Sequence, residues 1–101
     1  MKVKNQGEWE RVLEANPEDS YGGRILRFAE RWALRMEARL ASGFEAMGDI
    51  ALETKDETNL RLTDIQLCQA VVALAKHWEH GADLKVWYGK RRQAGEERTC
   101  T

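Results

Sequence analysis

The chain has 101 residues, of which 43% are hydrophobic and 33% are charged, and its formal net charge is −1. This length allows one domain, and the composition is too apolar for a disordered protein. A dedicated DNA-binding domain is normally basic, so the nearly neutral charge argues mildly against that class. Met1–Glu10 is charged, and no stretch approaches about 20 apolar residues, so we expect a cytosolic protein without a signal peptide or transmembrane segment.

The first predicted helix lies in NQGEWERVLEA. Asn5 is a candidate N-cap, and Glu8, three residues later, is a candidate capping-box partner. Trp9, Val12 and Leu13 form one apolar face. Because a helix this short is marginal in isolation, we expect it to dock on the rest of the protein.

The second predicted helix follows NPEDSYGG and ends before Gly43. It can begin at Asn16, with Pro17 in the first helical position, or at the rival cap Ser20. From residue 24 onwards the apolar residues recur at helical spacing, in the stripe Ile25, Ala29, Trp32, Met36 and Leu40. The glycine pair at residues 22–23 would let another backbone or a large ring approach closely.

A third helix is predicted in FEAMGDIALETKDE, and a long fourth one begins at Thr63, where TDIQ is a capping box. The broad apolar face of the fourth helix indicates a central helix packed on more than one side. Gly81 can kink or end it, but the register continues, so we expect one helix to Tyr88 with Gly89 as its stop. The sequence therefore predicts an all-α bundle of three to four helices over residues 1–89, followed by a flexible charged tail over residues 90–101.

Two columns of charge recur at every fourth residue. One is basic and lies on the second predicted helix, and the other is acidic and lies on the third: Arg27, Arg31, Arg35 and Arg39, and Glu45, Asp49, Glu53 and Glu57. Like charges at this spacing repel within a helix. The short connection predicts antiparallel helices, so the columns can face each other across a seam. Alternatively, an exposed arginine column could hold phosphates, or an exposed acidic column could occupy a positively charged groove meant for nucleic acid.

The remaining patterns point to binding rather than catalysis. In HWEH, His77 and His80 are spaced to share a metal, but zinc needs a third or fourth ligand, so we expect no metal site. No catalytic arrangement and no phosphate-binding loop stands out, which predicts a protein that is not an enzyme and has no cofactor. Trp32 and Trp78 fit the apolar stripes and are expected in the core.

Trp87 and Tyr88 precede a basic run. Aromatic and basic residues together can bind nucleic acid or form a protein-binding hot spot. The alternative is a helix end that packs on its neighbour.

The segments SYGGRILRFAERWALRMEARLASG and AVVALAKHWEHGADLKVWYG resemble a group of small phage- and prophage-encoded helical proteins. These carry an aromatic-Gly segment followed by AERWA-xx-ME, and later a WEHG helix ending in an aromatic pair. The resemblance covers roughly residues 20–89. The group looks like one that includes anti-CRISPR inhibitors of the type I-F surveillance complex. The resemblance implies a stoichiometric blocker that binds the crRNA-holding subunits in the cytoplasm of the bacterial host and stops target-DNA binding.

The resemblance does not supply the contact residues, so we take them from charge and aromatic character. The predicted partner-binding residues are Glu45, Asp49, Glu53, Asp56, Glu57, Trp87 and Tyr88. The rival prediction is a nucleic-acid-associated phage accessory protein that uses Arg24, Arg27, Arg31, Arg35, Lys90, Arg91 and Arg92. A third alternative is a homo-oligomeric helical structural protein.

Overall fold

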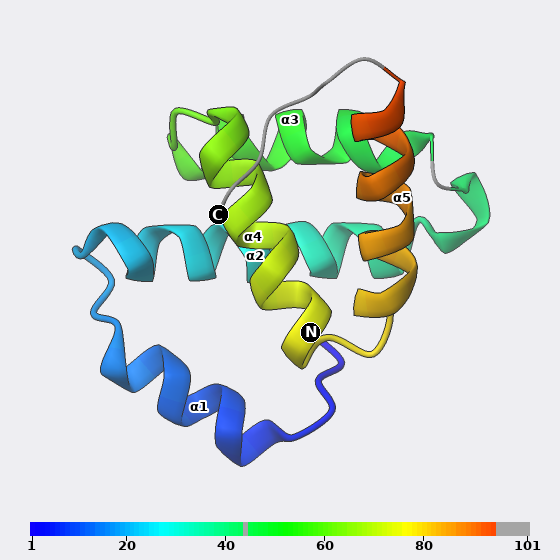
Figure 1. Cartoon of the computed structure of the whole chain (residues 1–101). Helices are drawn as coiled ribbons and strands as arrows, with labels where there is room; N and C mark the ends of the chain where they lie inside the picture. The colour runs from blue at the N-terminus through cyan, green and yellow to red at the C-terminus, as the bar shows by residue number, and fades with distance from the viewer. Residues whose placement is uncertain (44, 95–101) are drawn as a thin grey trace.

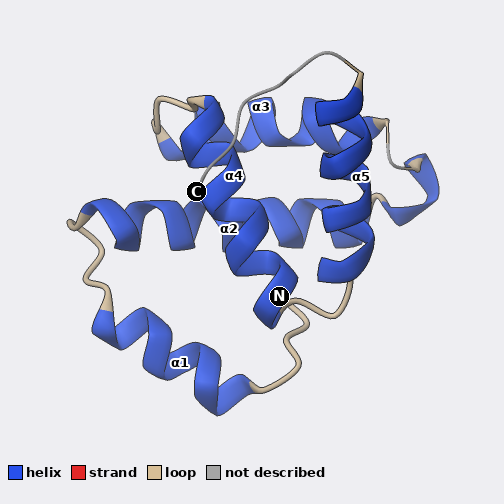
Figure 2. Ribbon diagram, in the orientation of Figure 1, coloured by secondary structure: helices blue, strands red, loops and turns tan. Residues whose placement is uncertain are grey.

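The computed structural model describes residues 1–43 and 45–94, and their regular elements are helices (Figure 1, Figure 2). The elements are α1 (Gln6–Ala15), α2 (Tyr21–Ala38), the short 3-10 helix η1 (Leu40–Ser42), α3 (Ala46–Thr58), α4 (Asp64–His77) and α5 (Gly81–Gln93). The all-α prediction is confirmed, but the predicted number of helices was too small. Among the described residues, no helix combines the length and apolar character needed to span a bilayer.

Local capping signals set the starts of three helices. The Asn5 side chain accepts a hydrogen bond from the backbone N–H of Glu8 (2.9 Å), as predicted. The Ser20 hydroxyl accepts one from the backbone of Gly23, so the rival cap at Ser20 begins α2. Thr63 and Gln66 bond each other reciprocally in a capping box, which fixes the start of α4.

The predicted long fourth helix is two helices, α4 and α5, because the helical conformation is interrupted between His77 and Gly81. Trp78 adopts an extended conformation and forms an isolated antiparallel bridge with Val3. This bridge ties the N-terminal segment to the break. At Gly81 an added Cβ would overlap the Leu74 carbonyl oxygen, so α5 starts in direct contact with the backbone of α4. Only glycine allows this approach, which explains why a sequence with continuous helical register folds as a pair.

The predicted stop at Gly89 was wrong, because α5 continues through it to Gln93. A Cβ at this glycine would meet nothing within 4 Å, so the residue serves no tight turn there. The basic run Lys90–Arg92 lies in the last turn, where positive charge favours a helix C-terminus. Residues 95–101 of the predicted tail lie outside the described residues, as does Phe44 of the predicted third helix.

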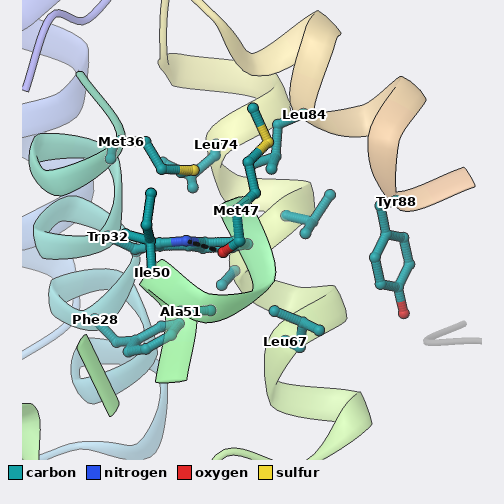
Figure 3. Packing of buried hydrophobic residues seen from close by; sticks show 14 of the residues in the cluster. Phe28, Trp32, Met36, Met47, Ile50, Ala51, Leu67, Leu74, Leu84 and Tyr88 are labelled. Atoms are coloured by element: carbon teal, nitrogen blue, oxygen red, sulfur yellow. Dashed lines mark hydrogen bonds between the residues drawn. The ribbon is translucent and has the colours of Figure 1, made fainter. Parts of the chain in front are cut away.

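One hydrophobic core contains residues of the four helices α2, α3, α4 and α5 (Figure 3). α2 packs against α3 and α4, and α4 packs against α5. Trp32 and Trp78 are fully buried, as predicted, and the Trp32 indole donates a hydrogen bond to the Met47 carbonyl oxygen (3.0 Å). This bond satisfies the buried indole and fixes the start of α3 on α2.

Two glutamates of α2 anchor the N-terminal part of the chain. Glu30 accepts a hydrogen bond from the indole of Trp9 (2.8 Å), which is 2% exposed and docks α1 as predicted. Glu37 accepts hydrogen bonds from the indole of Trp78 (2.7 Å) and the backbone N–H of Lys2 (2.8 Å). Each glutamate therefore satisfies a buried indole that would otherwise lose a hydrogen bond on burial.

Candidate functional site: a groove between α3 and α5

The predicted seam between α2 and α3 exists, but it uses only part of each charge column. Arg31 and Arg35 both pair with Glu57, and Arg35 also pairs with Glu53 (3.2 Å). Arg39 pairs with Glu53 at 2.7 Å. The arginines of α2 therefore alternate with the glutamates of α3, which relieves the repulsion within the arginine column. These pairs are exposed, so they set the register of the two helices more than they stabilise the fold.

The ion pairs of Arg31, Arg35 and Arg39 with Glu53 and Glu57 form an arginine ladder. We expect this ladder to make the protein less stable in acid. The hydrogen bond from Arg39 lowers the pKa of Glu53, and the one from Arg35 lowers the pKa of Glu57. Both carboxyl groups have a lower pKa in the folded protein than in the unfolded chain. The stabilisation that the ionised carboxylates contribute is therefore present above the unfolded pKa and is lost as pH falls through the folded pKa. Melting temperature measured from neutral to acidic pH should fall less steeply for the Glu53→Gln, Glu57→Gln variant. Equal acid dependence would contradict this account.

Helix geometry explains why the other members of the columns leave the seam. Residues four apart on an α-helix are offset by about 40°, so three such steps turn a side chain by about 120°. At one end of the arginine column, Arg27 turns to α1 and donates to the carbonyl oxygens of Asn16 (2.8 Å) and Gly23 (3.1 Å). At the far end of the acidic column, Glu45 and Asp49 turn away from α2. Both carboxylates are exposed and have no hydrogen bond or ion pair with other described residues.

Glu45 and Asp49 lie on the rim of a groove of about 470 Å³. Figure 1 shows its setting, where the C-terminal half of α5 passes the N-terminal end of α3. The groove also receives apolar side chains from α3, α4, α5 and the α3–α4 connection: Ala51, Leu52, Leu62, Leu67 and Trp87. Leu52 is 56% exposed and adds apolar surface to the groove. An apolar floor with unpaired carboxylates at its rim is typical of a surface that binds another molecule.

Gly48 keeps this groove open. A Cβ at residue 48 would lie 3.3 Å from Nη1 of Arg91 and 3.7 Å from Cζ2 of Trp87. The Arg91 guanidinium lies 5.7 Å from the centre of the Trp87 ring, in a cation–π arrangement. The same indole also contacts the core, since its ring centre is 6.2 Å from that of Trp32 in a T-shaped arrangement. Trp87 is therefore held in place before any partner arrives, which lowers the entropy lost on binding.

The structure separates the remaining predicted partner-binding residues from this groove. Glu53 and Glu57 are used by the arginine ladder, and Asp56 is exposed on α3 beside Lys55 (3.4 Å). Tyr88 is 8% exposed and belongs to the core, so it is a poor contact residue. The predicted set is thus divided among four environments: the groove, the ion pairs with α2, the exposed side of α3 and the core.

The groove also contains residues that the sequence analysis did not select, namely Gly48, Leu52, Leu62 and Leu67. The signal for Leu52 was present in the sequence, as an apolar residue between two members of the acidic column. Leu62 belongs to a segment without a clear helical period, so no pattern predicted its place in the groove.

The rival nucleic-acid set is split between the two ends of α3. Arg24, Arg27 and Arg31 line a pocket with Thr58 at the C-terminal end of α3. Arg91 lies beside Gly48 at the other end, about 15 Å from Thr58 along the helix. Arg35 is engaged with Glu53 and Glu57, Lys90 is exposed, and Arg92 is half-buried. The structure does not join these residues into one basic track.

The two histidines pack against tryptophans. The ring centre of His77 is 5.3 Å from that of Trp9, and the ring centre of His80 is 5.2 Å from that of Trp78. Both histidines are half-buried. In the part of the chain that the structure describes, no three His, Cys, Asp or Glu residues group as metal ligands would.

Fold and site together define a small helical protein with a surface groove between α3 and α5. The model of the family described as type I Thoeris inhibitor Tad4 matches residues 1–100, and the chain belongs to this family. It is a family of small phage anti-defence proteins, so the phage-inhibitor class is confirmed. The resemblance to type I-F CRISPR inhibitors named the wrong defence system, because the family is directed at Thoeris. No curated protein and no solved structure matches the chain.

Proposed function

We propose that this chain inhibits type I Thoeris defence by binding a protein component of that bacterial system through the groove between α3 and α5. It acts by occupying its target in a stable complex and catalyses no reaction. Membership of the family is the reason for naming type I Thoeris as the target. The groove is the reason for proposing binding as the mode of action. The partner segment that fits is a loop or helix end with an apolar side chain beside a lysine or arginine.

The observation that carries this proposal is the division of the acidic column. Glu53 and Glu57 are neutralised by arginines of α2, whereas Glu45 and Asp49 have no such pairing. Exposed carboxylates beside an apolar floor attract a cationic residue and steer its approach, while burial of apolar surface supplies affinity. Trp87, already packed against Trp32, provides the rigid aromatic surface that is common in binding hot spots.

We expect charge reversal at the groove to abolish binding without unfolding the protein. Asp49→Lys should weaken the complex at least about tenfold, and the double variant with Glu45→Lys more than about a hundredfold, because each lysine faces a cationic partner residue. Each protein of a type I Thoeris system would be purified, and binding would be measured by calorimetry and by size-exclusion chromatography. The inhibitory activity of each variant would be measured by plating phage that encode it on bacteria that carry the system.

Asp56→Lys is the matched control, since it makes the same change on the same helix outside the groove. It should bind and protect the phage as the unchanged chain does. If the unchanged chain forms a complex that Asp49→Lys and Asp56→Lys weaken equally, the groove is not the contact. If the unchanged chain binds no protein of the system, the proposal itself is wrong.

A further inference from the structure

A second pocket, of about 320 Å³, lies at the opposite end of α3 and is lined by three arginines of α2. Arg24, Arg27 and Arg31 are spaced by three and four residues, which places them on one face of that helix. Glu18, Phe28, Glu57, Thr58 and Leu60 complete the lining. Neither the family description nor the groove accounts for this pocket.

We propose that this pocket is a binding site for a small phosphorylated molecule. A phosphate group accepts several hydrogen bonds at once, and guanidinium groups match it with paired N–H donors. The buried side chains of Phe28 and Leu60 lie behind the arginines and complete the pocket wall. The volume is in the range of small-ligand sites. This inference is independent of the proposed function.

The three arginines differ in how they are held, and the difference favours a bound anion. Arg27 is fixed by hydrogen bonds to the carbonyl oxygens of Asn16 and Gly23, which leave its positive charge uncompensated by a carboxylate. The Arg24 side chain is exposed and has no hydrogen bond or ion pair with other described residues. Arg31 pairs with Glu57, but that carboxylate is shared with Arg35. The pocket therefore retains an excess of positive charge.

A nucleic acid is a poorer fit than a small molecule. A strand that joined this pocket to the basic end of α5 would pass the exposed carboxylate of Asp56 on α3. It would also meet Glu45 and Asp49 at the rim of the groove. The overall charge of −1 adds no long-range attraction for a polyanion.

Glu18 is the one described lining residue whose unpaired negative charge disfavours a bound anion. Its removal should raise the affinity for phosphate, whereas removal of an arginine should lower it. Its side chain is exposed at the pocket and carries a negative charge that no described arginine pairs with. Glu18→Gln should therefore tighten phosphate binding. Arg24→Gln should weaken it about tenfold or more, because one charge-assisted hydrogen bond is lost.

The test is calorimetric titration of the purified chain with inorganic pyrophosphate at low ionic strength. We expect binding by the unchanged chain, tighter binding by Glu18→Gln and weaker binding by Arg24→Gln. Arg61→Gln is the control, since Arg61 is exposed and lies outside the pocket, and it should leave the affinity unchanged. Arg24 is also exposed, so its variant should keep the melting temperature of the unchanged chain.

Three results would overturn the proposal. The first is absence of binding at millimolar pyrophosphate. The second is an equal loss of affinity in Arg24→Gln and Arg61→Gln, which would indicate diffuse attraction to any positive charge. The third is tighter binding of a double-stranded oligonucleotide that Lys90→Gln weakens as much as Arg24→Gln, which would assign the arginines to a nucleic-acid surface.

Discussion

Gly81→Ala should destabilise the protein by about 3 kcal/mol, although alanine is the better helix former at that position by about 1 kcal/mol. Residue 81 is the first residue of α5. An added Cβ would lie 2.7 Å from Cα of Ala75 and would overlap the carbonyl oxygen of Leu74. Because α4 is packed between α2 and α5, its backbone cannot move away without disturbing the core.

Thermal unfolding followed by circular dichroism measures this effect, and we expect the melting temperature to fall by roughly 10–20 °C. Gly89→Ala is the matched control, because a Cβ at that helical position would meet nothing within 4 Å. It should leave stability unchanged or raise it by up to about 1 kcal/mol. If the two variants melt at the same temperature, close packing of α5 on α4 is not what residue 81 provides.

The contrast between these glycines shows where sequence patterns predicted the fold and where they did not. The caps at Asn5, Ser20 and Thr63 depend on residues three positions away, so the sequence pattern contains the whole signal. The break before Gly81 depends on a bridge between Trp78 and Val3, which are far apart in the chain. No local period carries that information, and the apolar register by itself favours a continuous helix.

The charge columns show a similar limit for the candidate site. Their spacing correctly predicted that α2 and α3 face each other through Arg31, Arg35, Glu53 and Glu57. The spacing could not show which residues take part. Residues four apart are offset by about 40° around the helix, so within a few turns their side chains no longer face the neighbouring helix. The acidic members that leave the seam, Glu45 and Asp49, are the ones that remain available for a partner, whereas Arg27 is bound to carbonyl oxygens.

Gly48→Ala should nearly preserve partner binding, whereas Gly48→Trp should abolish it. Gly48 lies on α3 inside the groove, where a Cβ would be 3.3 Å from the mobile end of Arg91 and 3.7 Å from Trp87. Gly48→Ala fits after a small shift of the arginine, so it should keep the affinity within a few-fold. It should also raise stability by up to about 1 kcal/mol, because alanine favours the helix.

Gly48→Trp should lower affinity for the Thoeris protein by more than about a hundredfold, because its indole would fill the space that the partner's apolar side chain must enter. Gly89→Trp introduces the same side chain at an open position about 200° around α5 from Trp87, and it should bind normally. Circular dichroism must show both tryptophan variants folded. If Gly48→Trp still binds while Asp49→Lys does not, the contact is limited to the acidic rim, and the apolar floor is not part of the interface.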